Sequence, residues 1–186
     1  MSQKEHLNLE GIIKILSIRA SMNTGLSSEL KIAFPNIIPV SRPLVELPEN
    51  IDPNWLSGFT TGEGCFFVGV KKCLSHKSEV QVSLSYSISQ HSRDTLLFKT
   101  IQNSLGAGKL SIRPNVVELT IMKLSDLDLK IIPLFNKYPI QGVKALDYAD
   151  FCKVAALMKV NYHKTKEGLV QIRNIKSGMN TKRIYG

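Results

Sequence analysis

Residues 54–67 constrain the fold of this chain most, because they join a helix of small residues directly to an apolar strand. Asp52 is a suitable N-cap for that helix, and Pro53 fits its first turn. Small residues on one face of a helix let a second helix backbone approach closely, as in G-x-x-x-G pairs. The small face predicted here consists of Ser57, Gly58, Thr61 and Gly62. The sequence therefore predicts a helix–helix interface.

A single acid, Glu63, stands where this small face ends, just before Gly64 breaks the helix. Two such helices packed together would bring two carboxylates side by side, which is an arrangement suited to a divalent metal. One carboxylate is too few for a complete metal site. We therefore expect the second acid to come from another helix of the same kind.

Residues 56–64 (LSGFTTGEG) resemble the signature of the LAGLIDADG homing endonucleases over its nine positions, and the Trp-Leu-x-Gly-Phe and Gly-Glu-Gly-x-Phe flanks make the resemblance specific. The resemblance implies that Glu63 is the metal-binding acid and that the main-chain oxygen of Gly62 is a second ligand. Hard oxygen ligands with retained waters suit Mg²⁺, so we expect Mg²⁺ as the cofactor, with other divalent cations as alternatives. The earlier acid of the family falls on Thr61, a departure that weakens polar contacts at the helix end more than the metal site.

The size and charge of the chain are compatible with this resemblance. Its 186 residues fit one domain of about 100–150 residues plus an extension. A formal net charge of +9 favours a polyanionic partner. No apolar run is long enough to span a membrane, and residues 1–6 show no signal-peptide or transit sequence. We therefore expect no membrane partner and a protein used where it is made.

The chain contains an internal repeat, in which a pattern that begins at His6 returns 157 residues later at His163. Both copies are predicted to be amphipathic helices. Eight positions are identical, and in the first copy they are His6, Glu10, Gly11, Ile15, Ile18, Met22, Asn23 and Thr24. The repeat predicts that the parent architecture has two similar halves. Residues 1–24 are then the terminal helix of a preceding half, and residues 25–53 are a Pro-rich extended linker. Residues 54–186 are a whole half, which forms the LAGLIDADG endonuclease domain.

Hydrophobic periodicity predicts the elements of that half. Residues 80–90 alternate strictly between apolar and polar, which is typical of a strand buried on one face only. The other predicted elements are a strand at 65–72, a helix at 92–105 with Leu96, Leu97, Ile101 and Leu105 facing inward, a hairpin of strands at 109–113 and 116–123, and helices at 125–138, 144–162 and 164–180. This order gives an α+β fold, with a four-stranded antiparallel sheet and helices on one face. It matches the αββαββα unit of the LAGLIDADG family, and the resemblance covers essentially the whole chain.

The open face of the predicted sheet is the first candidate functional surface. Short hydrogen-bonding side chains and basic residues on a sheet are suited to base edges in the major groove of DNA, and the family places its concave sheet there. The predicted DNA-binding residues are Lys71, Gln81, Ser83, Ser85, Ser87, Ser89, Lys109, Ser111, Arg113, Glu118 and Thr120.

Two further residues match positions around the active site of the family. Gln90 ends the alternating strand where the resemblance implies a polar residue that orders water. Lys144 opens a helix where it implies a basic residue near the scissile phosphate. With Glu63, they are the predicted catalytic residues.

The leading hypothesis is a site-specific double-strand DNA endonuclease that hydrolyses phosphodiester bonds with a divalent metal. Two alternatives remain: an intron RNA maturase that assists splicing, and a nucleic-acid-binding remnant that does not cleave. With one motif, the chain must pair with itself or with a complementary LAGLIDADG half. The start within a repeat also fits the C-terminal part of a longer two-motif protein. Members of the family are commonly encoded in mitochondrial or plastid genomes, so we expect a mitochondrial protein, with a plastid as the alternative.

Overall fold

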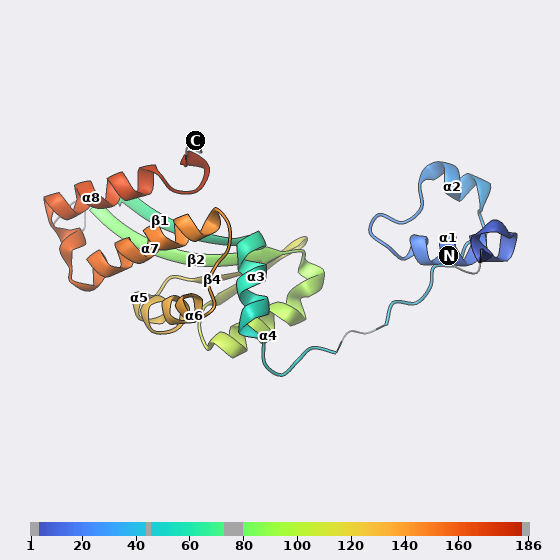
Figure 1. Ribbon diagram of the computed structural model, residues 1–186, viewed down its shortest axis with the longest axis horizontal. Coiled ribbons are helices and arrows are strands. Elements are labelled where there is room, and N and C mark those ends of the chain that lie inside the picture. Colours follow the sequence, from blue (N-terminus) through green and yellow to red (C-terminus); the bar gives the residue numbers. More distant parts are fainter. Residues whose placement is uncertain (1–3, 44–45, 73–79, 184–186) are drawn as a thin grey trace. The chain divides into compact units, whose positions relative to one another are not determined.

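The computed structural model describes residues 4–43, 46–72 and 80–183. The chain divides into two compact units, Met1–Glu46 and Leu47–Gly186 (Figure 1). Within the described residues, none of the helices is long and apolar enough to cross a bilayer.

The second unit has the predicted order of helices and strands. Its elements are α3 (Pro53–Glu63), β1 (Gly64–Lys72), β2 (Val80–Gln90), α4 (Thr95–Leu105), β3 (Lys109–Arg113), β4 (Val116–Ile121), α5 (Leu124–Asp126), a π-helical turn (Leu127–Ile131), α6 (Ile132–Lys137), α7 (Lys144–Lys159) and α8 (Lys166–Ser177). Short 3₁₀ turns precede α4 and α8 and follow α8. The predicted α+β fold is confirmed.

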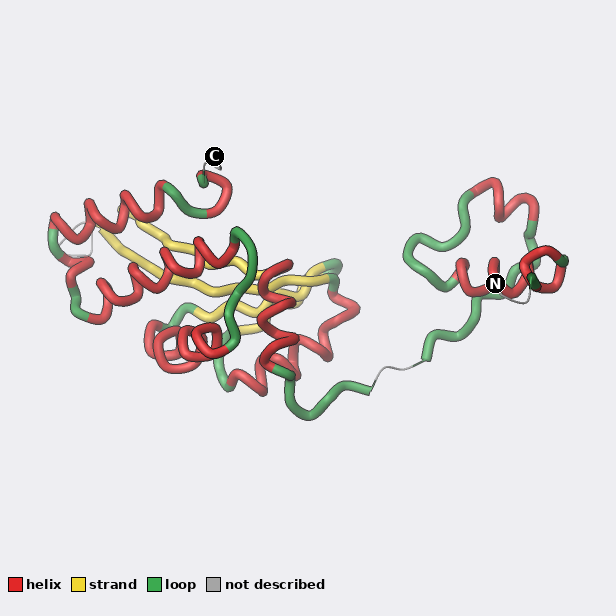
Figure 2. Tube along the Cα trace, in the orientation of Figure 1, coloured by secondary structure: helices red, strands yellow, loops and turns green. Residues whose placement is uncertain are grey.

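The four strands form one antiparallel sheet in the order β1-β2-β4-β3. Alternate residues of β2 are buried, namely Val82, Leu84, Tyr86 and Ile88, so one face of the strand carries the core. The strands lie behind a layer of helices in Figure 2. Buried residues of α3, α4, α6, α7 and α8 join one hydrophobic core with this apolar face, as the sequence predicted.

Aromatic side chains fill the layer between the sheet and the helices. The ring of Phe66 stacks on that of Tyr86, with centroids 5.3 Å apart, and meets the edge of Phe135 at 5.9 Å. On α4, Phe98 is fully buried, whereas Leu96 is 66% exposed. The prediction that Leu96 faces inward was therefore wrong. Three successive apolar residues leave the helical phase undecided, and packing against β3 and β4 selects Phe98 and Ile101.

The first unit is built on α1 (Leu9–Ala20), followed by the short α2 (Ser28–Ala33). The segment after α1 folds back onto it, because the Val40 amide donates to the Ser17 carbonyl (3.1 Å) and the Ser21 hydroxyl donates to the Val40 carbonyl (2.5 Å). Leu26 is buried in this unit. The first part of the predicted linker is thus packed against α1, and the division of the chain falls after Glu46.

Candidate catalytic centre and nucleic-acid interface

The position of Glu63 follows from how α3 begins and ends. The Asp52 carboxylate caps the helix by accepting the Trp55 amide at 2.9 Å. At the other end the chain passes from helix to strand without a loop. A Cβ atom on Gly64 would lie 2.6 Å from the Thr60 carbonyl oxygen, so only glycine fits this turn. Glu63 is therefore held as the last residue of α3, exposed at the start of β1.

The small face of α3 has an open edge and an occupied edge. A Cβ atom on Gly58 or Gly62 would meet nothing within 4 Å, so this edge is open to another backbone. Ser57 is 5% exposed and its hydroxyl donates to the Pro139 carbonyl (2.9 Å). The structure therefore narrows the predicted interface, since Ser57 is already covered by its own chain.

Thr61 stands where the family carries an acid, and its hydroxyl is used within the chain. It donates to the Ser57 carbonyl (2.9 Å) and accepts the Gln141 amide (3.2 Å). These bonds tie the end of α3 to the segment before α7. Thr61 thus stabilises the local backbone without adding a carboxylate beside Glu63.

Lys144, the first residue of α7, lies at the end of α3. Its Nζ donates to the Gly62 carbonyl at 2.9 Å. Burial lowers the pKa of Lys144, and the neighbouring Cys65, Glu63 and Asp147 oppose this by favouring its charged form. The structure therefore brings Lys144 to Gly62 and Glu63, although Lys144 and Gly62 are 82 residues apart along the chain.

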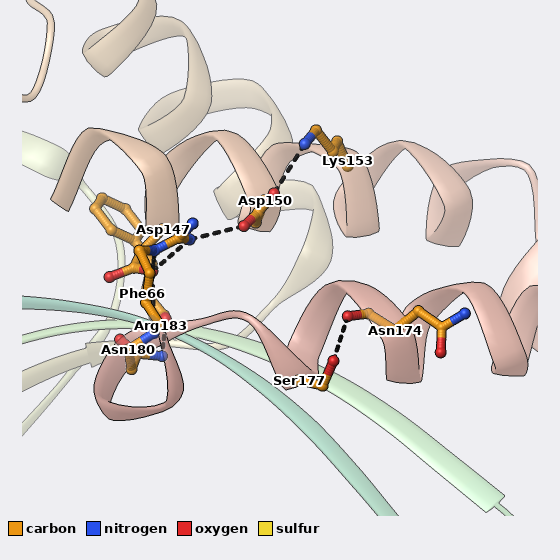
Figure 3. A network of polar contacts seen from close by, with 8 residues as sticks. All are labelled: Phe66, Asp147, Asp150, Lys153, Asn174, Ser177, Asn180 and Arg183. Atoms are coloured by element: carbon orange, nitrogen blue, oxygen red, sulfur yellow. Dashed lines mark hydrogen bonds and ion pairs between the residues drawn. The ribbon is translucent and has the colours of Figure 1, made fainter. Parts of the chain in front are cut away.

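A polar clasp holds the start of α7 over β1 (Figure 3). Asp147, one turn after Lys144, accepts the Asn180 amide at 3.0 Å and the Arg183 guanidinium at 2.8 Å. The Asn180 side chain donates to the Phe66 carbonyl (3.2 Å). The segment after α8 thereby fixes α7 to β1, and with it the backbone that carries Lys144.

The second acid of the clasp is Asp150, which accepts Arg183 at 2.8 Å and Lys153 at 2.8 Å. Burial by itself would raise the pKa of Asp150, but the hydrogen bonds and positive charges of Lys153 and Arg183 outweigh it and lower the pKa. Sequence reasoning missed this clasp, because its members are far apart along the chain and have no shared motif.

Gln90 lies at the same end of the sheet as Glu63. Gly64, the first residue of β1, is paired with Ile88, and Gln90 ends β2 two residues further on. Its side-chain oxygen accepts the His91 amide at 3.0 Å. The predicted role of Gln90 in ordering water stays a prediction.

The strand register places the predicted DNA-binding residues on one face of the sheet. Directly paired residues point to the same side of a sheet. Lys71 is paired with Gln81, and Thr120 is paired with both Ser87 and Lys109. Glu118 joins the same rows through Ser89 and Ser111. The remaining members, Ser83, Ser85 and Arg113, follow by the two-residue alternation of their strands. This set is called the open face below.

The open face also contains residues of β1 that sequence reasoning missed. Cys65, Phe67 and Gly69 are paired with Ser87, Ser85 and Ser83. A Cβ atom on Gly69 would lie 2.3 Å from the Ser83 hydroxyl oxygen, so a larger residue there would require the Ser83 side chain to shift. Phe67 is 45% exposed. The residues on either side of Phe67 in β1 are also apolar and point to the other face. The sequence of β1 therefore shows no alternation that would reveal which face Phe67 occupies.

A basic pocket of about 270 Å³ lies beside the open face, between β1 and α8. Its cationic side chains are those of Lys71, Lys72, Arg173, Lys176 and Lys182. None of these five forms an ion pair with an acid in the described part of the chain. The signal in the sequence was the spacing of Arg173 and Lys176, which share a face of the repeat helix. Such a cluster of unpaired cations suits an anionic ligand.

The oxygen atoms at the end of α3 suit a hard divalent cation, but they form only part of a site. Glu63 offers an exposed carboxylate, and the Gly62 carbonyl faces the same region, where Lys144 contacts it. Mg²⁺ prefers such oxygen ligands and keeps several waters. Within residues 4–43, 46–72 and 80–183, no group of three or more His, Cys, Asp or Glu side chains could hold a metal. A second acid from outside this chain fits that donor set.

Comparison with known families decides the classification. A family model described as LAGLIDADG endonuclease matches residues 56–155, from the motif helix into α7. The chain belongs to the LAGLIDADG endonuclease family. The match includes most of α3, the whole sheet and Lys144, so the geometry above is that of a LAGLIDADG unit.

Curated relatives of this LAGLIDADG protein are longer than the chain itself. It is 40% identical over 176 residues to the probable intron-encoded endonuclease 3 of Neurospora crassa, covering 92% of this chain and 33% of the relative. It is 37% identical over 191 residues to the probable intron-encoded endonuclease 2 of the same fungus, covering 96% of this chain and 41% of that relative. The chain thus spans well under half the length of these relatives.

Solved structures show the same fold. The I-LtrWI LAGLIDADG homing endonuclease bound to target DNA is 42% identical, with a TM-score of 0.95, covering 98% of this chain and 62% of that one. I-SmaMI bound to cleaved DNA is 42% identical with a TM-score of 0.94, covering 99% and 62%. I-SmaMI has also been solved on uncleaved DNA in the presence of calcium ions.

Proposed function

We propose that this LAGLIDADG protein is a site-specific double-strand DNA endonuclease that hydrolyses phosphodiester bonds with Mg²⁺ or another divalent cation. The observation that carries the proposal is the exposed Glu63 at the end of α3, beside the Gly62 carbonyl and Lys144, next to a polar sheet face. The relatives named as endonucleases, and the solved relatives on target DNA, support the same activity.

The open face is proposed to read the DNA sequence. Its Ser, Thr and Gln side chains offer neutral donors and acceptors, and Lys and Arg favour guanine. The Arg113 guanidinium and the Glu118 carboxylate lie 3.0 Å apart, which fixes two of the contact groups relative to each other. The basic pocket beside this face is proposed to bind backbone phosphates, which would set the position and orientation of the duplex.

Glu63 and the Gly62 carbonyl would hold the metal, with retained waters. A bound Mg²⁺ supplies an activated water, stabilisation of negative charge and help for the leaving oxygen. Lys144 would supply a positive charge to the scissile phosphate, since its Nζ lies at the same end of α3. Gln90, at the same end of the sheet, is proposed to orient water by hydrogen bonding.

A complete centre needs a second motif helix, from a homodimer or a complementary LAGLIDADG half. The open edge of α3 at Gly58 and Gly62 offers the close approach that this pairing requires, with Thr61 beside it. The longer relatives favour a preceding half in a two-motif protein, with residues 1–24 as its terminal helix.

The decisive experiment selects cleaved sites from a randomised duplex library with Mg²⁺, using the chain by itself and with a complementary half. Glu63→Gln keeps the shape of the side chain but removes its charge, so we expect cleavage to fall by at least about 100-fold, on the scale of losing an electrostatic contact at the reacting group. Glu167→Gln, an exposed acid on α8, is the matched control and should leave the rate unchanged. Absence of any Glu63-dependent cut under both conditions would sink the nuclease proposal.

A second candidate is an intron RNA maturase, since the relatives are named as encoded in introns and the basic sheet could bind RNA as well as DNA. Splicing assistance that survives Glu63→Gln, with no cleavage of DNA, would establish it. Specific binding without either activity would instead identify a non-cleaving remnant. We also propose a mitochondrial location, with a plastid as the alternative, because family members with intron-encoded genes are common in organelle genomes.

A further inference from the structure

One aromatic side chain of the open face is surrounded by small residues. Phe67 of β1 is 45% exposed and is paired with Ser85 of β2. The adjoining pairs of these two strands on the same face are Cys65 with Ser87 and Gly69 with Ser83. All of these neighbours are much smaller than a phenyl ring. The Phe67 ring is therefore the bulkiest group in this part of the open face.

The ring of Phe67 is held in place without being buried. Its Cε1 atom lies 3.5 Å from the position that a Cβ atom on Gly69 would take, so the ring lies against the next small residue of the same strand. The Nζ atom of Lys176 on α8 lies 5.5 Å from the centre of the ring, which is a cation–π contact. A phenylalanine side chain has few rotatable bonds, so a further contact costs little conformational entropy.

The place of this ring distinguishes it from an ordinary exposed apolar side chain. Lys176, which contacts the ring, also lines the basic pocket together with Lys71. Phe67 therefore lies between the cations proposed to bind backbone phosphates and the polar side chains proposed to read bases. Its neighbours in β1, Phe66 and Val68, are buried in the core. The alternation of the strand thus directs Phe67 toward whatever lies on the open face.

The major groove of DNA offers one apolar group that suits such a ring. The C5-methyl group of thymine projects there, whereas cytosine and uracil have only a hydrogen atom on the corresponding carbon. A phenyl ring has no hydrogen-bond donor, so it does not recognise the polar base edges. It gains free energy when its own surface and that of the methyl group are removed from water. 5-Methylcytosine carries the same methyl group and fits the same contact.

We propose that Phe67 determines specificity at one base pair of the target by contacting the C5-methyl group of a pyrimidine. The target then requires thymine at that position and accepts 5-methylcytosine in its place. This inference rests on the proposed function of the open face in reading DNA. It adds an apolar contact to the hydrogen-bonding groups of that face.

The test measures DNA binding, so that its outcome does not depend on cleavage. The 186-residue chain, by itself and with a complementary half, first selects a target from a randomised duplex library. Ca²⁺ replaces Mg²⁺, as in the complex of I-SmaMI with uncleaved DNA. Each thymine of the target is then replaced in turn by uracil, which lacks only the methyl group. We expect one replacement to weaken binding about fourfold, on the scale of one buried methyl group.

Variants of Phe67 assign this methyl effect to the ring. Phe67→Ala should bind the thymine and uracil duplexes equally, because the contact with the methyl group is gone. Phe67→Leu keeps an apolar side chain and should retain a smaller preference for thymine. Leu96→Ala, which removes a 66% exposed apolar side chain from α4, is the matched control. It should keep the difference of about fourfold between the two duplexes.

Cytosine at the same position gives an independent comparison. Cytosine and 5-methylcytosine form the same hydrogen bonds with guanine and differ by the methyl group alone. The wild-type chain should therefore bind the methylated duplex about fourfold more tightly than the unmethylated one. Phe67→Ala should bind both of these duplexes equally.

Three results would overturn the inference. One is a target in which no thymine methyl group affects binding. Another is a methyl effect that persists in Phe67→Ala, because it would then arise from the shape of the DNA. The third is binding without any sequence preference, which would also remove the proposed reading role of the open face. Loss of Mg²⁺-dependent cleavage with an intact methyl effect would count against the nuclease alone.

Discussion

The two faces of the sheet have opposite chemistry although they alternate along the same strands. Phe66 and Phe67 are adjacent in β1, yet Phe66 is fully buried beneath the helices and Phe67 is 45% exposed. The covered face carries most of the large apolar side chains, and the open face carries mainly polar and charged ones. Stability and the proposed DNA recognition would therefore be separable, because residues of one strand would serve them on opposite sides of the sheet.

The largest expected difference lies between Phe66→Ala and Phe67→Ala. Removing the Phe66 ring leaves a cavity among packed aromatic rings, so the free energy of unfolding should fall by about 3–5 kcal/mol. Phe67→Ala should cost less than about 1 kcal/mol, because its ring is half exposed. Urea denaturation measures both. Equal losses would mean that the open face is also part of the stable core.

The next pair of substitutions compares hydroxyl groups on the two faces of the sheet. The Tyr86 hydroxyl is 2.7 Å from the Thr60 hydroxyl, and both residues are fully buried. Burial raises the pKa of Tyr86, although the Thr60 hydrogen bond opposes the shift, so this phenol stays protonated. Tyr86→Phe leaves the Thr60 hydroxyl unpaired and should cost about 1–3 kcal/mol.

Ser85→Ala is the matched change on the open face. It should alter the free energy of unfolding by no more than about 0.5 kcal/mol, since Ser85 lies outside the core. If Ser85→Ala destabilised the fold as much as Tyr86→Phe, the proposed division between the faces would be wrong.

A third prediction concerns DNA binding. Lys71→Ala removes a cation shared by the open face and the basic pocket, so the slope of log affinity against log salt should decrease by about 0.9 for one lost phosphate contact. Stability should change by less than about 0.5 kcal/mol. Lys99→Ala, an exposed lysine on α4, is the control and should change neither quantity. If Lys71→Ala and Lys99→Ala reduced the salt slope equally, DNA would be attracted by the net charge of the protein only.

The smallest effect on stability is expected in acid, where the polar clasp that holds α7 over β1 loses its ion pairs. The pKa of Asp150 is lowered from 3.8 in the folded protein, so its ion pairs stabilise the fold above that pH. This stabilisation is lost as the pH falls through the lowered pKa. Free energies of unfolding between pH 7 and pH 3 should therefore show wild type above Asp150→Asn at neutral pH, with the two converging in acid. Parallel curves would exclude this role for Asp150.

The local sequence pattern was sufficient to predict the structure where one residue type dictates one conformation. The alternation in residues 80–90 predicted β2 with both of its ends, and with it which side chains share the open face. The small face ending in Glu63 and Gly64 predicted α3 and the position of the acid, because glycine is required where helix meets strand.

The local sequence pattern did not predict which side chain is buried where several residues were equally suitable for burial. In α4 the successive apolar residues Leu96 to Phe98 left the buried side undecided, and contact with β3 and β4 selected Phe98. Ser57 was predicted to face a partner helix, but the Pro139 carbonyl accepts its hydroxyl within the same chain. The basic pocket also escaped prediction, since β1 and α8 supply it from distant positions.

The sequence by itself determined the α+β order, the LAGLIDADG resemblance, the single acid and the repeat, because each depends on residues close together or on a simple period. Only the tertiary structure decided that Lys144 contacts the Gly62 carbonyl and that the segment after α8 clasps α7. It also decided that Ile15 is exposed whereas Ile172 is buried. The physical reason is that burial and hydrogen bonding depend on which distant segment lies alongside a residue. Identical residues in the two repeat helices therefore have different environments.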